Sequence, residues 1–256
     1  MPGEILKVER HGNYVTLTLN RAEKRNALNQ PLIVALDQAL RSIETDKEIR
    51  AVVLRGEGGH FCAGIDLAEV SRVEGGHNPT TLEGAFGRLE KLPVPTIAAI
   101  SGAALAGGLE LALHCDLRIA AEDARLGMTL GRLGLMVPYD FTRKLIEVMG
   151  SANTAYILYT ADLIDGRRAL SMGMVHEVVA AAKLNEAAST LAEKVAANAP
   201  LSLRAMKATV RRCMSETFDA YHDDLLSLAG DVRRSDDARE GVRAFLEKRK
   251  PVWQAR

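Results

Sequence analysis

The stretch that decides the fold is Ser101–Asp116, with the sequence SGAALAGGLELALHCD. An apolar run typical of a strand, Thr96–Ile100, precedes it, and a segment rich in helix-forming residues, Leu109–Leu113, lies near its end. The sequence therefore predicts that a helix begins at Gly107 and Gly108. The first turn of a helix has unpaired backbone N–H groups and a partial positive charge, and glycine lets a ligand oxygen approach closely. We expect an oxyanion-binding site here.

Glu110 adds a second functional group to this predicted site. It follows Gly107 by three residues, about one helical turn, so its carboxylate should lie near the same end of the helix. A strand, a glycine turn and a helix are also the ordinary connection in any α/β protein. A glutamate in the first turn is favourable for electrostatic reasons alone. The stretch by itself leaves both interpretations open.

A second glycine-rich segment, Arg55–Glu69, follows the apolar run Ala51–Leu54 and breaks on glycine before Asp66. Two such turns can supply two converging N–H groups. Within them, FCAGIDL at 61–67 and GGLE at 107–110 closely resemble the two oxyanion-hole signatures of the enoyl-CoA hydratase/isomerase family, also called the crotonase superfamily. Further similarity lies in Leu19–Arg21, Asn26–Asn29, Pro93–Ile100 and Glu240–Pro251, so the resemblance covers essentially the whole chain.

Size and composition are those of a soluble α/β protein that acts on a small molecule. The chain has 256 residues, with 33 basic and 33 acidic side chains, so no net charge favours nucleic acid or an anionic membrane as a partner. Three widely spaced cysteines favour reduced thiols in the cytoplasm over a disulfide framework. We expect neither a metal site, a targeting segment nor a membrane span.

The order of strand-like and helix-like segments is typical of an α/β fold. A hairpin of two strands, 5–8 and 14–19, opens the chain. Asn29 can cap a helix that has Pro31 in its first turn and leucines at helical spacing from Leu32 onward. We expect further strands at 51–54, 96–100, 116–120 and 175–179, loops at 74–79, 101–106 and 129–138, and helices at 82–92, 142–150, 151–159, 166–172, 183–198, 201–213, 216–229 and 236–247.

The resemblance implies a particular arrangement of these elements. Members of the family form a spiral of ββα units, here residues 1–195 with the acyl-CoA site, followed by a C-terminal helical region, residues 196–256. In the family this region forms the trimer contact, and two trimers commonly stack into a hexamer. A simpler alternative is that these helices only cover their own core.

The resemblance also implies the chemistry. The N–H groups of Ile65 and Gly107 would bind the thioester oxygen of an acyl-CoA and stabilise an enolate. Coenzyme A would be part of the substrate, with no permanently bound cofactor. Substrate contacts are implied for Ala63, Gly64, Asp66, Leu67, Gly108 and Leu130, and contacts with coenzyme A phosphate or adenine for Lys24, Arg25, Phe245 and Lys248, the last two across a subunit boundary.

Hydration in this family uses two glutamates as a general acid–base pair. Glu110 matches the first, but Leu130 occupies the position of the second and can neither donate nor accept a proton. Asp140 lies about where some isomerases of the family place an extra acid. The resemblance therefore implies enoyl-CoA hydration or double-bond isomerisation, with Glu110 and Asp140 as candidate acids.

Other functions are weighed against this one. Gly56 and Gly58 follow a strand as in dinucleotide-binding oxidoreductases, but Phe61 replaces the third glycine. A serine hydrolase would require Gly-x-Ser-x-Gly, which the sequence lacks. A non-catalytic acyl-CoA-binding protein, or another crotonase-type reaction such as decarboxylation or C–C bond cleavage, stays an alternative.

Overall fold

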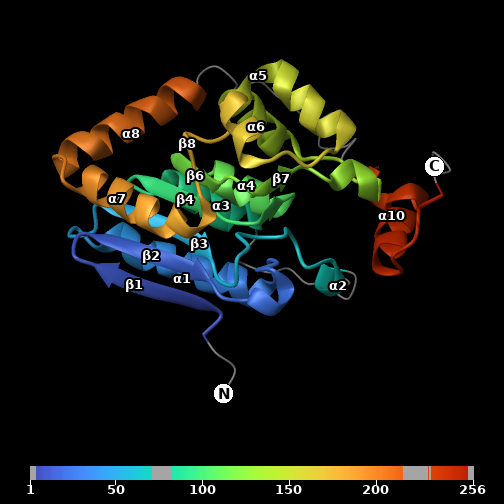
Figure 1. Ribbon diagram of the computed structural model, residues 1–256, viewed down its shortest axis with the longest axis horizontal. Helices are drawn as coiled ribbons and strands as arrows, with labels where there is room; N and C mark the ends of the chain where they lie inside the picture. Colours follow the sequence, from blue (N-terminus) through green and yellow to red (C-terminus); the bar gives the residue numbers. More distant parts are fainter. Residues whose placement is uncertain (1–3, 71–81, 216–229, 231, 253–256) are drawn as a thin grey trace.

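A mostly parallel six-stranded sheet forms the centre of the computed structural model, which describes residues 4–70, 82–215, 230 and 232–252 (Figure 1). Its strands, in spatial order, are β1 (Leu6–His11), β2 (Tyr14–Leu19), β3 (Ala51–Gly56), β4 (Thr96–Ile100), β6 (Leu117–Ala121) and β8 (Glu177–Val179). Only the β1–β2 pair of this sheet is antiparallel. A second, parallel sheet pairs β5 (Ala103–Leu105) with β7 (Arg125–Gly127). The predicted α/β class is confirmed.

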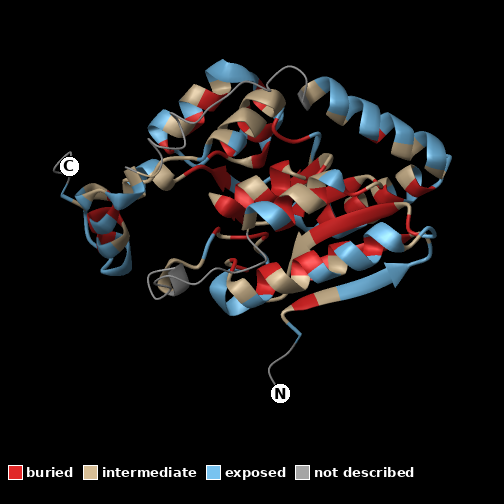
Figure 2. Ribbon diagram, turned by 180° about the vertical axis from the view of Figure 1, so that it is seen from behind, coloured by how far each residue is buried: buried red, intermediate tan, exposed pale blue. Residues whose placement is uncertain are grey.

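Helices cover both faces of the large sheet. α7 packs on β3, β4 and β6, whereas α1 and α3 pack against each other on the opposite face (Figures 1 and 2). The buried residues are concentrated in the sheet and the inner helix faces, while α8 is largely exposed (Figure 2). The helices are α1 (Gln30–Thr45), α2 (Leu67–Val70), α3 (Leu82–Lys91), α4 (Gly107–Leu113), α5 (Tyr139–Thr160), α6 (Gly166–Ser171), α7 (Leu184–Ala196), α8 (Pro200–Ser215) and α10 (Asp236–Leu246), with short 3-10 turns η1 (Ala22–Lys24), η2 (Leu130–Leu133) and η3 (Ala181–Lys183).

Helix α1 begins where its capping sequence predicts. The Asn29 side-chain oxygen accepts a hydrogen bond from the Leu32 N–H at 3.1 Å, and Pro31 occupies the first turn, where its missing N–H costs nothing. The apolar stripe of this helix, Leu32, Leu36, Leu40 and Ile43, is buried. Burial of each such side chain stabilises the fold by about 1.5–3 kcal/mol.

Two local expectations are wrong in detail. The small residues expected as a turn include a strand, β5, because residues 103–105 pair with β7. The loop expected at 129–138 contains η2. The helices expected at 142–150 and 151–159 are confirmed: they form two helical stretches that share the label α5 and are separated by Gly150, whose φ of 75° is not helical. The expected loop at 74–79 and the helix at 216–229 lie outside the described residues.

The sheet topology places the two glycine-rich segments at one edge. Strands β3 and β4 are neighbours and parallel, with Leu54 opposite Ala98 and Arg55 opposite Ala99. The carboxyl ends of parallel strands meet at the same edge of a sheet, which is where α/β proteins commonly bind ligands. Residues 57–66 and 101–107 therefore leave the sheet side by side.

The last described helix, α10, lies at one end of the molecule beside η2 (Figure 1). A Cβ on Gly241 would collide with the carbonyl oxygen of Leu133, so only glycine allows this close packing. The division into residues 1–195 and 196–256 stays a prediction. Among the described residues, no helix is both long and apolar enough to cross a membrane.

Candidate active site

Backbone hydrogen bonds join the two loops that leave β3 and β4. The Phe61 N–H donates to the Ser101 carbonyl oxygen at 2.7 Å. Cys62 donates to the Ala103 carbonyl at 2.9 Å and accepts from the Leu105 N–H at 3.0 Å. The first loop, residues 57–66, is called the first donor loop because it contains Ile65. These bonds fix it along the chain segment that leads into α4.

This pairing brings the two predicted donors together. Leu28 donates to the Gly64 carbonyl at 2.7 Å and accepts from the Asp66 N–H at 2.9 Å, so the Ile65 N–H between them takes no part in these bonds. The Gly107 N–H opens α4 and has no partner within the helix. A Cβ on Gly107 would lie 3.7 Å from the Ile65 nitrogen. Two neighbouring backbone donors of this kind are the arrangement of an oxyanion hole.

The residues around Gly107 give α4 an abrupt start. Ala106 has φ 48° and ψ −118°, a conformation that costs a non-glycine residue on the order of 1–3 kcal/mol. Its N–H donates to the Gly127 carbonyl at 2.9 Å, and its carbonyl accepts from the Glu110 N–H at 3.0 Å. A Cβ on Gly108 would collide with the Cys62 carbonyl oxygen. Gly108 therefore permits α4 to pack on the first loop, and its contact with an acyl group stays a prediction.

Glu110 is half-buried in the first turn of α4. Burial, followed by the negative charges of Glu83 and Asp140, raises its pKa from 4.5 to about 8. Glu83 lies in the first turn of α3 and Asp140 in the first turn of α5, so three helices direct negative charge toward one place. A carboxyl group with such a pKa can both give and take a proton near neutral pH, as an acid–base catalyst must.

Comparison of the whole chain with known families agrees with this geometry. The family model for enoyl-CoA hydratase/isomerase matches residues 9–256. The chain belongs to this family. It is an acyl-CoA-transforming enzyme, and the resemblance predicted from the two motifs is confirmed.

Relatives and solved structures match over almost the full length. The short-chain-enoyl-CoA hydratase of Clostridium acetobutylicum is 34% identical over 256 residues, which cover 95% of each chain. The crystal structure of carnitinyl-CoA hydratase from Mycobacterium avium has a TM-score of 0.87 at 35% identity and covers 98% of this chain and 99% of that one. That of methylmalonyl CoA decarboxylase has a TM-score of 0.90 at 28% identity and full coverage of both chains. The crotonase-like fold is confirmed.

Leu130, which resemblance places at the position of the family's second glutamate, is apolar in this enoyl-CoA hydratase/isomerase homologue. Leu130 begins η2 and packs, partly buried, against the hydrophobic core. It lies three residues after Gly127, whose carbonyl accepts the hydrogen bond from the Ala106 N–H just before α4. The next acid along the chain is Asp140, which is exposed. Its negative charge helps to raise the pKa of Glu110. Its catalytic role stays a prediction.

The candidate coenzyme contacts of the N-terminal half border the first donor loop. The Arg25 carbonyl accepts from the Ala63 N–H at 3.0 Å, and the side chains of Lys24 and Arg25 are exposed. Leu67, which begins α2, is half-buried. Asp66 forms a 3.0 Å ion pair with Arg21, and both side chains are only 11% exposed. The Asp66 carboxylate thus has a partner within the chain.

The remaining candidates, Phe245 and Lys248, lie at the end of α10 and are exposed. Because α10 packs on η2 of the same chain, it stands next to the turn that begins at Leu130. Their contact with coenzyme A across a subunit boundary stays a prediction.

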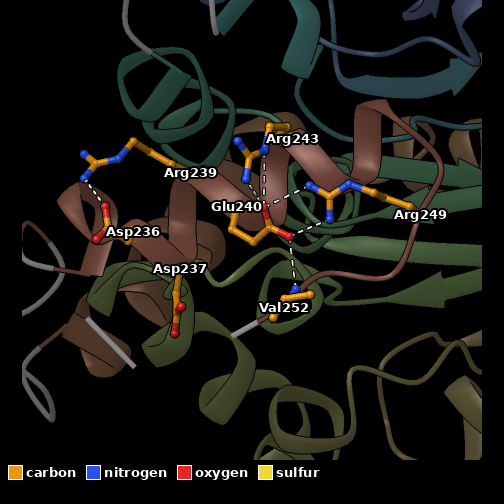
Figure 3. Close-up of a pocket in the computed structure, with 7 residues that line it drawn as sticks. All are labelled: Asp236, Asp237, Arg239, Glu240, Arg243, Arg249 and Val252. Carbon is orange, nitrogen blue, oxygen red and sulfur yellow. Dashed lines mark hydrogen bonds and ion pairs between the residues drawn. The ribbon is translucent and has the colours of Figure 1, made fainter. Parts of the chain in front are cut away.

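A pocket of about 560 Å³ lies along α10 (Figure 3). There Glu240 accepts hydrogen bonds from the Arg243 and Arg249 side chains and, at 3.0 Å, from the Val252 N–H. The arginine charges are therefore partly balanced within the pocket itself. Neither this pocket nor another of about 380 Å³ beside β2 is lined by Ile65, Gly107 or Glu110. The pair of backbone donors, not a large cavity, identifies the candidate site.

Sequence reasoning assigned no function to three residues that the structure places at this site: Arg21, Asn26 and Glu83. The fully buried Asn26 amide donates to the Glu57 and His60 carbonyls at 2.9 and 2.7 Å, and its oxygen accepts from the Arg21 N–H at 2.9 Å. Arg21 and Asn26 belong to the motifs at 19–21 and 26–29, which were a signal of family but not of role. Their partners in the first loop lie between 31 and 45 residues away.

Proposed function

We propose that this protein adds water across the double bond of a short-chain enoyl-CoA thioester. The observation that carries the proposal is the position of Glu110, one helical turn from the Gly107 N–H and the neighbouring Ile65 N–H. The names of two relatives, a short-chain-enoyl-CoA hydratase and a carnitinyl-CoA hydratase, support hydration as the reaction.

The two N–H groups would hold the thioester oxygen. When water attacks the β-carbon, the electron pair of the double bond moves toward this oxygen and an enolate forms. Donors already in place stabilise that charge without further reorganisation, each by about 3–4 kcal/mol in comparable sites. Because the donors are backbone atoms, the Ile65 side chain can remain apolar.

Glu110 would carry both proton transfers. Its carboxylate accepts a proton from water as the oxygen bonds to the β-carbon, and the resulting carboxylic acid then protonates the α-carbon of the enolate. The product contains one added water, and Glu110 returns to its starting state. A single carboxyl group is assigned both steps because Leu130 offers none, while the exposed Asp140 can orient the incoming water.

Double-bond isomerisation is the second candidate reaction. It needs one group that removes a proton from the α-carbon and returns it to the γ-carbon, and a lone carboxyl group with a pKa of about 8 suits this task. The same oxyanion hole would stabilise the dienolate.

Mass spectrometry separates these reactions. Crotonyl-CoA should gain the mass of one water, whereas isomerisation of vinylacetyl-CoA would leave the mass unchanged and yield crotonyl-CoA. Calorimetry should show that crotonyl-CoA binds and that free crotonate does not bind comparably. Thioester binding without water addition to any short enoyl-CoA would contradict the hydratase proposal.

The substrate itself would bring coenzyme A, so the reaction requires no resident cofactor. Lys24 and Arg25, exposed beside the first loop, are proposed to contact its phosphates, with Phe245 and Lys248 as further contacts. We also propose a cytoplasmic location, since Cys62 and Cys115 are buried as free thiols.

We further propose that the protein assembles as a homotrimer, either alone or stacked in pairs as a hexamer. The support is the exposed α8, which carries the apolar side chains of Leu201, Met206 and Val210 at 79%, 53% and 63% exposure. Apolar side chains at such exposure on one helix are typical of a protein–protein contact. Light scattering at micromolar protein should give the mass of three or six chains, and a monomer with full acyl-CoA binding would contradict the assembly.

A further inference from the structure

The first donor loop is held by a buried ion pair that family resemblance did not predict. The Arg21 guanidinium contacts an Asp66 carboxylate oxygen at 3.0 Å and donates to the Ala27 carbonyl at 2.6 Å. The other Asp66 oxygen accepts from the Ala68 N–H at 3.3 Å, at the start of α2. One arginine therefore links residues 21–28 to the residue that directly follows the donor Ile65.

The backbone of the same segment determines which way the donor points. The C=O and the N–H group of one planar trans peptide point to opposite sides. The Gly64 carbonyl and the Asp66 N–H both bond to Leu28, at 2.7 and 2.9 Å, so the Ile65 N–H between them must point away from Leu28. Gly107 lies close to Ile65, with its Cβ position 3.7 Å from the Ile65 nitrogen.

The relative position of Leu28 and Asp66 thus sets the direction of the Ile65 N–H. Arg21 contacts the chain at both places. It reaches the chain beside Leu28 through the Ala27 carbonyl and reaches Asp66 through the ion pair. Removal of either charge would break this largely buried ion pair and leave the remaining charge less well compensated, which is unfavourable. A lysine at position 21 could not reproduce this two-point contact, since its ammonium group is a point charge on a flexible chain, whereas the guanidinium holds two donors in a fixed plane.

We infer that Arg21 and Asp66 are positioning residues, which act through the Leu28–Gly64–Asp66 backbone bridge to aim the Ile65 N–H at the thioester oxygen. This inference rests on the proposed oxyanion hole. It gives Asp66 a role within the chain, in place of the coenzyme contact implied by resemblance. Arg21 then contributes to the catalytic site without touching the substrate.

The experiment measures the donor itself, with butyryl-CoA carrying a ¹³C label in the thioester carbonyl. This saturated thioester binds but cannot be hydrated, so the infrared band of its carbonyl reports hydrogen bonding independently of turnover. In the wild-type protein the band should move to lower frequency on binding. Asp66→Asn, which keeps the size of the side chain, should lose at least half of that displacement.

Kinetics provide the second readout. In both Asp66→Asn and Arg21→Met, kcat for crotonyl-CoA should fall about 10- to 100-fold, part of the 10²–10³ lost when an entire donor is removed. KM should change less than threefold, because the coenzyme contacts are untouched. Arg21→Lys should recover only a part of kcat, since it restores the charge but not the two-point contact.

The matched control is Lys207→Met. Lys207, whose side chain is 7% exposed, forms an ion pair at 2.7 Å with Asp116, whose side chain is 31% exposed, at the amino ends of the strands, opposite the site. It should keep the wild-type carbonyl band and kcat, even if it lowers the melting temperature. No band displacement in the wild type would overturn the oxyanion hole itself. A full displacement in both Asp66→Asn and Arg21→Met would overturn only the positioning role.

Discussion

Replacement of Glu110 by glutamine should remove catalysis and, at alkaline pH, stabilise the fold. Burial and the charges of Glu83 and Asp140 keep this carboxyl group protonated up to a pKa of about 8. The folded protein must therefore ionise Glu110 at a cost whenever the pH exceeds that value. Glutamine has a similar shape and never ionises, so the variant avoids this cost but cannot transfer a proton.

The size of the effect follows from proton linkage. Below pH 4.5, Glu110 is protonated in both the folded and the unfolded chain, and the free energy of unfolding is unaffected. Between pH 4.5 and 8 only the unfolded chain releases the proton, so the free energy of unfolding falls as pH rises. At about 1.4 kcal/mol per pH unit, the full loss is about 5 kcal/mol at pH 8 and above. Because Glu110 is half-buried and partly screened by solvent, we expect about 2–4 kcal/mol.

Urea denaturation at fixed protein concentration measures this difference. Glu110→Gln should gain about 2–4 kcal/mol over the wild type at pH 9 and little at pH 5, while its turnover falls by about 10²–10⁴. Glu186→Gln, at an exposed glutamate on α7, serves as the control and should show no such gain. In the wild type, kcat/KM should rise with pH through about 8, as the reactive carboxylate forms. Parallel stability curves for wild type and Glu110→Gln would refute the reasoning.

Three further changes test the surroundings of this group. Asp140→Asn removes a negative charge near Glu110, so its pKa should fall and the rise of kcat/KM should move to lower pH; an unchanged profile would place Asp140 outside the site. Leu130→Glu should raise water addition to crotonyl-CoA if a second carboxyl group limits the rate, and mass spectrometry would detect the increase. Gly108→Ala should destabilise the fold by about 1–3 kcal/mol and reduce turnover, because the new methyl group collides with the first loop. In the control Gly87→Ala, the added Cβ would have open space around it, and the melting temperature should not fall.

The parts of the site that are local in sequence could be predicted from sequence. The start of α1 at Asn29 and the start of α4 at Gly107 each depend on a few consecutive residues, and both are confirmed. The strand β5 was missed because its formation depends on a partner, β7, about 20 residues further along the chain. The same limit applies to Arg21, whose ionic partner lies 45 residues away.

The raised pKa of Glu110 could not be predicted from its own helix, and a comparison with Glu90 on α3 shows why. Burial is the largest influence on both glutamates, and in both it raises the pKa. Glu90 nevertheless has a lowered pKa, because Lys144 lies 2.6 Å away and His114 lies 3.7 Å away.

His114 follows Glu110 on α4 by one helical turn, and Lys144 follows Asp140 on α5 by one turn. Further from the helix N-termini, between α3, α4 and α5, the Lys144 ammonium therefore neutralises the half-buried Glu90 carboxylate. Closer to the helix N-termini, the charged groups among the described residues that shift the pKa of Glu110 are both acids, Glu83 and Asp140. Three packed helices thus hold one glutamate as a structural ion-pair partner and leave the other ready to exchange a proton beside the oxyanion hole.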